Sequence, residues 1–328
     1  MSAHYAMDSL FEALDNLHQA FFEGLVQPFL MALGLAGYLE RAYEGSIWFL
    51  YGLLQLVVLL LVIGPLQRWR AVEPVSNPAT VRTDVLYTLI HRLGLFKLGM
   101  FFLLEPVIDG LLGQLSVWGW VAPQIDDLWP GVTDQPLLSF VLYLLAFDLI
   151  HYAIHRAQHH FNWWWKLHSL HHAQRQMTMW SDNRNHLLDD VLTSALLALC
   201  AQLIGLPPGQ FVALVVLTQL SESLQHANLR LDFGRWGERL WISPRFHRRH
   251  HAIGVGHESM DKTRQRVVLG GHNFGVLLPW WDMLFGTADF SPGYQPTGVR
   301  DQVEQGRLYG EGWWAQQWLG LQRLRNRA

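Results

Sequence analysis

A long stretch without charged side chains sets the strongest limit on the fold. Residues 45–67 contain no Asp, Glu, Lys or Arg, and their core reads SIWFLYGLLQLVVLLLVIG. A helix of about 20 apolar residues is long enough to cross the hydrocarbon core of a bilayer. We therefore predict that this stretch spans a membrane. The less favoured alternative is a buried helix in a large soluble core.

Three further apolar segments show the same pattern with interruptions. Residues 84–104 contain Arg92 and Lys97, which either snorkel or line a polar interior. Residues 136–150 form another candidate span, which we expect to continue as a helix into the histidines. An uncharged run over 191–221 is divided by the sequence GLPPG. Because proline cannot continue a helix, we predict a hairpin of two short apolar helices there.

Composition agrees with a chain that is partly solvated by lipid. Half of the residues are apolar and only 16% are charged, whereas ordinary soluble domains have roughly 25% charged residues. The net charge of −3 implies no general attraction to nucleic acid. The single cysteine, Cys200, excludes a disulfide framework and a cysteine-based zinc site. We predict an all-α, integral-membrane helical bundle with a cytoplasmic, histidine-rich cap.

The distribution of basic residues orients this bundle. Residues 105–135 carry five acidic residues and no Lys or Arg, whereas arginines follow the first and third candidate spans and the hairpin. The positive-inside rule then places 64–82, 156–186 and 227–328 in the cytoplasm. The N-terminus shows no secretory signal. We therefore expect a bacterial inner membrane, or the ER membrane in a eukaryote.

The 17 histidines are clustered along the chain rather than scattered. His151 and His155 share one face of a helix because they are four residues apart. The pattern HxxHH occurs twice, at 168–172 and at 247–251. In each copy the adjacent pair splays slightly, so its two members can serve different metals of a close pair. Packing does not require this spacing twice, and burying an unpaired histidine is costly. We therefore interpret these residues as metal ligands.

The number of histidines indicates more than one metal ion. His226 adds a ninth histidine in an apolar context, and the tenth ligand is either Glu222 or His186, between which spacing does not choose. A structural zinc takes four ligands and a catalytic zinc takes three from the protein. Imidazole also suits iron and copper. A redox-active metal pair beside a membrane would suit O2 activation and attack on unactivated C–H bonds.

The histidine motifs resemble a known family. The run DLIHYAIHRAQHHFNWWWKLHSLHH, followed by LQHANL, SPRFHRRHH, HNFG and WWDMLFGT, resembles the fatty acid hydroxylase / sterol desaturase superfamily over residues 137–290. The resemblance implies a di-iron centre on the cytoplasmic face that uses O2 to hydroxylate or desaturate a lipid. It also implies an external electron donor of the ferredoxin, cytochrome b5 or reductase type. The substrate stays open among a fatty acyl chain, a sterol-like ring, an ether lipid and a carotenoid.

The resemblance also implies roles for individual residues. The family's ligand motifs fall on His151, His155, His168, His171, His172, His226, His247, His250 and His251, with His186 as a further candidate. We expect Asp148, His159 and Asn273 to support these ligands from outside. Trp163, Trp164 and Trp165 are expected either in an aromatic belt at headgroup depth or in the wall of an acyl channel. Residues 252–271 look longer than usual in the family and are expected to form a solvated loop.

Four segments follow from this interpretation. They are an N-terminal interfacial helix or short apolar hairpin (1–44), N-terminal membrane helices (45–135), a fatty acid hydroxylase-like catalytic domain (136–290) and a C-terminal cytoplasmic tail (291–328). Two other functions use the same histidines differently. A membrane metal-binding or transport protein would hold the metal as cargo, and a haem-type electron carrier would use two of the histidines as axial ligands.

Overall fold

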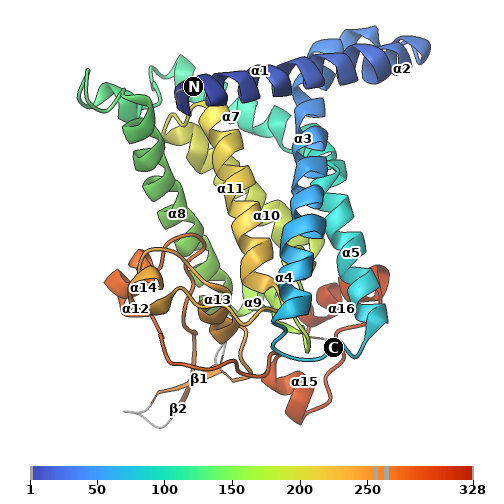
Figure 1. The fold of residues 1–328 in the computed structure, drawn as a ribbon, viewed down its shortest axis with the longest axis vertical. Coiled ribbons are helices and arrows are strands. Elements are labelled where there is room, and N and C mark those ends of the chain that lie inside the picture. Colours follow the sequence, from blue (N-terminus) through green and yellow to red (C-terminus); the bar gives the residue numbers. More distant parts are fainter. Residues whose placement is uncertain (1–2, 255–257, 262–265, 327–328) are drawn as a thin grey trace.

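Long helices run side by side along the long axis of the computed structural model, and shorter helices and loops form a cap at one end (Figure 1). The structure describes residues 3–254, 258–261 and 266–326. In chain order its elements are α1 Ala3–Phe21, η1 Phe22–Val26, α2 Gln27–Ala32, η2 Ala36–Tyr38, α3 Leu39–Val58, η3 Leu59–Ile63, α4 Gly64–Trp69, α5 Pro78–Arg92, α6 Leu95–Leu103, α7 Glu105–Val117, η4 Ile125–Asp127, α8 Pro136–His160, α9 Asn162–His172, α10 Leu187–Leu203, α11 Pro208–His226, α12 Gly234–Gly237, α13 Pro244–His250, β1 Glu258–Asp261, β2 Arg266–Leu269, α14 Trp280–Phe285, α15 Arg300–Glu304 and α16 Trp313–Leu324.

Two helical segments are long and apolar enough to cross a membrane. One runs continuously over Ala36–Trp69 and contains the predicted span 45–67, and the other is α8, at Pro136–His160. In α8 the helix continues from the predicted apolar stretch into the histidines, as its sequence indicates. Both predictions of a membrane-spanning length are therefore confirmed.

The expected span at 84–104 is wrong, because this stretch forms two helices instead of one. α5 ends at Arg92 and α6 begins at Leu95. Between them Gly94 adopts a φ of 78°, a left-handed conformation that glycine tolerates and that interrupts a helix. The Arg92 side chain does not snorkel. It is buried and its guanidinium lies 2.8 Å from the Asp182 carboxylate.

The uncharged run before Glu222 forms the predicted helical hairpin of α10 and α11. Gly205 has a φ of 65° at the turn. Pro207 is the N-cap of α11 and Pro208 is its first residue, where the missing amide hydrogen costs nothing. The Tyr143 hydroxyl of α8 donates a hydrogen bond of 2.9 Å to the Gly205 carbonyl. The turn is therefore fixed to the neighbouring long helix.

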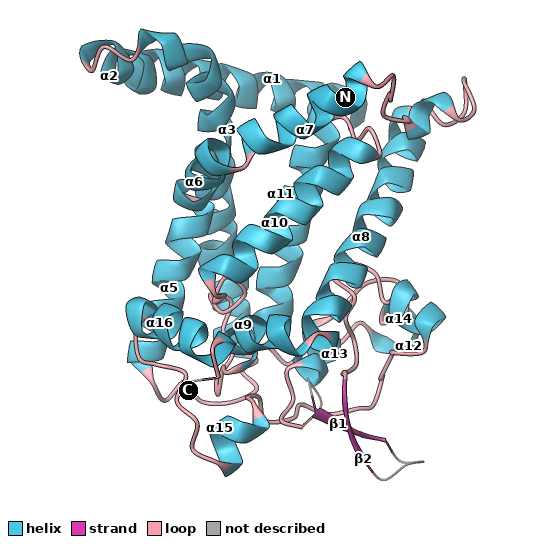
Figure 2. Ribbon diagram, turned by 180° about the vertical axis from the view of Figure 1, so that it is seen from behind, coloured by secondary structure: helices cyan, strands magenta, loops and turns pink. Residues whose placement is uncertain are grey.

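The two ends of the bundle differ in the elements that cover them. α1 and α2 lie across one end, roughly perpendicular to α3, and α7 lies at that same end (Figure 1). α9 and α13 to α16 lie at the opposite end (Figure 2). The N-terminal segment thus takes the form of the predicted surface helix and not of an apolar hairpin. The acidic connection before α8 and the histidine-rich segments fall at opposite ends, as the charge pattern predicts.

In the stretch after the third histidine motif, the described residues 258–261 and 266–269 form strands. β1 and β2 form an antiparallel two-stranded hairpin in which Glu258 pairs with Leu269 and Asp261 pairs with Arg266. Of the basic residues expected in the loop, Lys262 and Arg264 lie outside the described residues. The all-α prediction therefore holds for the bundle, with this hairpin as the exception in the described chain.

The C-terminal segment packs onto the bundle instead of extending away as a tail. α16 lies against α9 and α5. The Gln317 side chain donates to the Tyr87 hydroxyl of α5 at 2.8 Å and accepts from the Leu187 amide at the start of α10 at 2.7 Å. This single side chain therefore connects the last helix to two helices of the bundle.

Close packing of α3 on α5 predicts a destabilising substitution. A Cβ atom at Gly52 would overlap the Arg92 carbonyl, whereas one at Gly45 of the same helix would meet nothing within 4 Å. We expect Gly52→Ala to lower the free energy of unfolding by about 1–3 kcal/mol, the usual cost of overpacking. Gly45→Ala should leave it unchanged or raise it. Thermal melting in detergent measures both, and equal melting temperatures for the two variants would contradict the close approach.

Candidate metal centre

Nine buried histidines gather at the capped end of the bundle in two adjoining groups. Within each group the nitrogen atoms able to bind a metal all lie within 4.8 Å of one another. The first group has five members and the second has four: His155, His159, His168, His172 and His250, then His171, His226, His247 and His251. The rings of His172 and His251 stack with centroids 4.3 Å apart, so the two groups share a border.

The HxxHH motifs divide between the groups as their spacing predicts. In α9 the adjacent pair splits, with His171 in the second group and His172 in the first. In α13 the pair splits again, with His250 in the first group and His251 in the second. Neighbouring residues on a helix point about 100° apart, so adjacent histidines reach different centres. Each motif therefore contributes to both groups.

The first histidine box lies one turn later than expected. His151 is outside both groups, whereas His159, expected only to support the ligands, is a member of the first. His151, His155 and His159 follow one another at intervals of four residues on α8, so they form one stripe along the helix. Only the end of that stripe reaches α9 and α13. The His151 ring instead packs edge-on against Phe147, with centroids 4.9 Å apart.

In the first group three histidines donate a hydrogen bond through Nδ1, the ring nitrogen that faces away from the group. Two of them donate to backbone carbonyls, and the third, His168, donates to a carboxylate. Nδ1 of His155 donates to the Phe274 carbonyl at 2.9 Å, and Nδ1 of His250 donates to the His272 carbonyl at 2.7 Å. A carbonyl can only accept, so the proton of each ring sits on Nδ1 and the Nε2 lone pair is free. Nε2 of His250 is buried and has no hydrogen-bond partner within the described chain. A metal ion would satisfy such a nitrogen.

In the second group the Nε2 atoms face one another directly. The distances from His171 to His226, from His226 to His247 and from His247 to His251 are each 3.1 Å. Nitrogen ligands about 2.0–2.1 Å from one metal ion lie about 3 Å apart when their bonds meet at right angles. The four nitrogens thus have the spacing of ligands around a single ion.

Burial keeps these imidazoles in the form that binds metal. It lowers the pKa of His171, His247 and His251 well below the usual value, and the neighbouring imidazoles lower it further. Burial likewise lowers the pKa of His250 to about 3. These four histidines are therefore neutral at physiological pH, and a metal ion competes with no proton for their lone pairs. The residues fit a pair of metal ions.

Asp189 supports a histidine, and sequence reasoning missed it. One of its carboxylate oxygens accepts from Nδ1 of His168 at 2.9 Å. The other accepts from the Trp164 indole at 2.7 Å and from the Gln158 amide at 2.8 Å. The carboxylate is almost fully buried, with 1% of its residue surface exposed. The available signal was an Asp-Asp pair at the start of an otherwise apolar helix.

Asp148 supports a loop and not, as expected, an imidazole. Its carboxylate accepts from the amides of Leu277 and Leu278 at 2.8 and 3.1 Å, and from the Trp281 indole at 3.0 Å. Asp148 is buried on α8 one turn before the histidines, but it faces the segment after residue 272. It therefore fixes the loop that carries the two carbonyl acceptors.

Asn273 stands between the two residues whose carbonyls hold His250 and His155. Its φ is 61°, a conformation that asparagine tolerates better than most residues. Its side-chain amide donates to the carbonyls of Phe246 and Asp289 at 3.0 Å each, and its oxygen accepts from the Asp289 amide at 2.6 Å. Asn273 thus supports the ligands as expected, through the backbone on either side of it.

The three tryptophans of α9 differ in their surroundings. Trp164 and Trp165 are buried, and the Trp165 ring lies 5.0 Å from His159 and 5.2 Å from His172 between centroids. Trp165 therefore packs against the first histidine group, which neither the aromatic belt nor the acyl channel anticipated. Trp163 is 48% exposed.

Neither candidate for a tenth ligand joins the groups. His186 has both nitrogens occupied, because Nε2 donates to the Gln317 carbonyl at 2.9 Å and Nδ1 accepts from the Leu188 amide at 3.1 Å. It caps the N-terminus of α10. The carboxylate of Glu222 is also outside both groups, although its backbone carbonyl accepts from Nδ1 of His226 at 2.8 Å.

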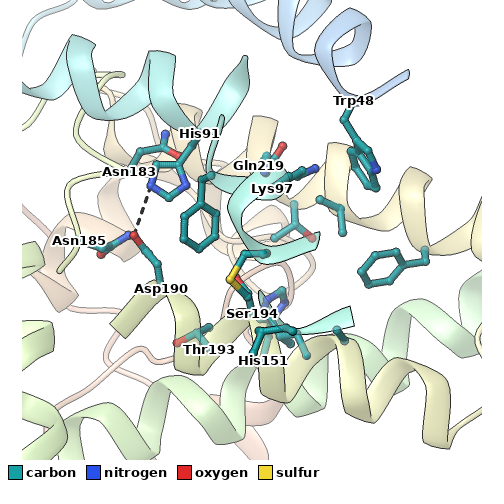
Figure 3. A pocket seen from close by; sticks show the side chains of 18 of the residues that line it. Trp48, His91, Lys97, His151, Asn183, Asn185, Asp190, Thr193, Ser194 and Gln219 are labelled. Atoms are coloured by element: carbon teal, nitrogen blue, oxygen red, sulfur yellow. Dashed lines mark ion pairs between the residues drawn. The ribbon is translucent and has the colours of Figure 1, made fainter. Parts of the chain in front are cut away.

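A cavity extends from the histidines into the bundle. A chamber of about 110 Å³ is lined by members of both groups, including His155, His171 and His247. A larger cavity of about 430 Å³ lies among the long helices, and Figure 3 shows part of its lining. Several residues, His151 and Glu222 among them, line both spaces. The larger cavity therefore adjoins the chamber that holds the metal-binding nitrogens.

Comparison with known proteins agrees with this site. The fatty acid hydroxylase family model matches residues 140–287, which contain all nine grouped histidines. The chain is 25% identical over 305 residues to ornithine lipid hydroxylase OlsE of Rhizobium tropici, an alignment that covers 91% of this chain and 85% of that protein. No solved structure gives a significant match.

Two further relatives match over shorter stretches. Fatty acid hydroxylase vlmA of a Lecanicillium species is 24% identical over 54% of this chain and 44% of its own length. Alkylglycerol monooxygenase of Caenorhabditis elegans is 27% identical over 47% of this chain and 27% of its own length. The chain thus spans less than half of these two proteins. All three relatives belong to the fatty acid hydroxylase superfamily, and the part of this chain that matches the family model, residues 140–287, carries the histidine motifs.

Proposed function

We propose that this protein is a membrane di-iron oxygenase that uses O2 to hydroxylate a lipid, with desaturation as the alternative outcome. The observation that carries the proposal is the pair of adjoining histidine groups, with five and four buried imidazoles. A single metal ion could not use nine ligands, whereas two ions could. Imidazole ligands and an oxygenase family together favour iron over other metals.

Each group would hold one iron. The first ion would be bound by members of the group that contains His155 and His250, and the second by the group that contains His171 and His247. A bound iron pair would supply the redox chemistry by which O2, two electrons and two protons convert a C–H bond into C–OH and water. The protein's own part is to fix the tautomer of the ligands and to keep water away.

Specific residues fix the tautomer of the ligands and keep water away. Asp189 and the carbonyls of His272 and Phe274 hold protons on the outer nitrogens, so the inner lone pairs stay directed at the metals. The buried ring of Trp165 covers the first histidine group, and Trp164 donates a hydrogen bond to Asp189. The cavity presents the substrate from the other side.

The names of the relatives support a lipid substrate. They act on an ornithine lipid, a fatty acid and an alkylglycerol. Apolar side chains such as Phe96, Met100 and Leu104 line the larger cavity and suit an alkyl chain. We further propose that the histidine end faces the cytoplasm, most simply of a bacterial inner membrane, and that a separate ferredoxin, cytochrome b5 or reductase supplies the electrons.

The two other functions fit the geometry less well. A transporter places its ligands near the middle of the bilayer, whereas the histidine groups involve α9 and α13 in the cap (Figure 1). A haem carrier needs two axial histidines with room for the macrocycle between them. Nε2 atoms 3.1 Å apart leave no such room.

Isotope labelling tests the reaction. Lipids of cells that express the protein under 18O2 should contain a species with one 18O atom per new hydroxyl, and cells without the gene should lack it. Loss of two hydrogens without label would indicate desaturation instead. Mass spectrometry distinguishes these results, and identical lipids in the two strains would refute an oxygenase.

Substitution of two histidines of α8 tests which box binds metal. His159→Ala should lose iron and product, because His159 belongs to the first group. His151→Ala should keep its iron, because His151 lies outside both groups. Iron content of the purified variants, measured per chain, decides the question. The opposite pattern would restore His151 as the ligand.

Removal of the Asp189 charge tests the support of His168. Asp189→Asn should weaken iron binding about 10–100-fold, as loss of such an outer contact usually does. The neighbouring Asp190→Asn is the matched control, because Asp190 faces His91 at 3.3 Å and contacts no member of the histidine groups in the described contacts. Iron retention against a chelator measures both. Equal retention would show that Asp189 has no such role.

A further inference from the structure

The cavity changes in polarity along its length. The residues that line only the larger cavity include many apolar side chains, among them Trp48, Phe96 and Leu104, together with polar ones such as Lys97 and Glu105. The residues that line both spaces are polar without exception: His151, Asp182, Asn185, Asp190, Thr193 and Glu222. A polar group suits this neck better than an apolar one, because apolar atoms would leave unsatisfied any neck side chain that is not paired within the protein.

Most charges around the neck are already paired within the protein. Asp182 lies 2.8 Å from the Arg92 guanidinium. Asp190 lies 3.3 Å from His91, an approach that Figure 3 marks with a dashed line. Lys97 lines the larger cavity but not the neck. Its ammonium nitrogen lies 3.0 Å from the centre of the Trp48 ring, which is a cation–π contact.

Glu222 also lines the neck, but it differs from these paired residues. Its carboxylate makes no hydrogen bond or ion pair in the interactions found across the described chain, although its side chain is half-buried on a helix of the bundle. A carboxylate held away from bulk water is costly unless a cation or donors accompany it. His151, whose Nδ1 also has no hydrogen-bond partner in the described chain, lines the same two spaces. The neck thus holds one carboxylate, that of Glu222, without a partner among the described interactions.

We propose that this neck binds an ammonium group of a lipid headgroup and that Glu222 pairs with it. The alkyl chain then lies in the apolar part of the cavity, and the carbon presented to the metals is one close to the headgroup. This inference rests on the proposed function, because it names the substrate class of the same site. A neutral sterol or an unsubstituted hydrocarbon chain would leave the Glu222 carboxylate unpaired.

Binding of two probes tests the proposal without any turnover. The first is the lauroyl amide of ethylenediamine, which ends in an ammonium group, and the second is its N-acetylated, uncharged counterpart. The full-length protein in detergent is incubated with an equal mixture, and the lipid that co-elutes in gel filtration is quantified by mass spectrometry. We expect the protein to prefer the ammonium probe at least about tenfold, as a charge-assisted hydrogen bond in a buried site provides.

Two variants assign that preference to one carboxylate. Glu222→Gln should bind the two probes equally, while its iron content and melting temperature stay those of the unaltered protein. Asp109→Asn, which removes an exposed carboxylate of α7 that does not line the cavity, should keep the preference. Equal binding of the probes by the unaltered protein, or a preference that survives in Glu222→Gln, would overturn the proposal.

Turnover then separates this inference from the proposed function. An ammonium preference without oxidation of any lipid would contradict the oxygenase and leave the headgroup site standing. Efficient oxidation of uncharged lipids, with no preference between the probes, would contradict the headgroup site alone. Should Glu222→Gln fail to fold, the comparison of the two probes on the unaltered protein still decides the outcome.

Discussion

Nine buried imidazole rings lie side by side, and burying their nitrogens is costly unless hydrogen-bond partners or metal ions satisfy them. This requirement explains much of the cap. The carbonyls of His272 and Phe274 and the carboxylate of Asp189 act on the outer nitrogens. The inner nitrogens of the second group come to 3.1 Å from one another. Ring nitrogens this close together are unfavourable in an apolar core, whereas ligands around metal ions adopt such spacing.

The loop after residue 272 depends on that same requirement. Asn273 and Asp282 hold its backbone, the second through hydrogen bonds from the amides of Phe274 and Gly275 at 2.9 and 2.7 Å. Asp148 holds the next part of the loop from within α8. Three buried polar side chains thus stabilise one short segment whose function is to present two carbonyls. Burial raises the pKa of Asp282 above its usual value, and the hydrogen bonds from the loop amides oppose part of that rise.

The bundle and the cap contribute different parts of the candidate site. Long apolar helices place one end of a cavity among alkyl-like side chains, and the cap places metal-binding nitrogens at the other end. The polar neck between them is lined by His151 of α8, Asp190 and Thr193 of α10 and Glu222 of α11. An enzyme that oxidises lipids needs this combination, because its substrate is dissolved in the membrane while electrons and protons arrive from water.

Spacing along the sequence was enough to predict the membrane-length helices, the hairpin at GLPPG and the splitting of each HxxHH motif between two centres. These features follow from local rules: helix length, the geometry of proline, and the angle between neighbouring residues on a helix. Sequence could not choose between His151 and His159, because both stand four residues from His155 on one stripe of α8. Only the position where α9 and α13 meet that helix decides which pair reaches the site. The same holds for Asp189 and the carbonyl of Phe274, which lie far from their imidazoles in sequence and meet them only because the tertiary fold brings distant helices and a loop together.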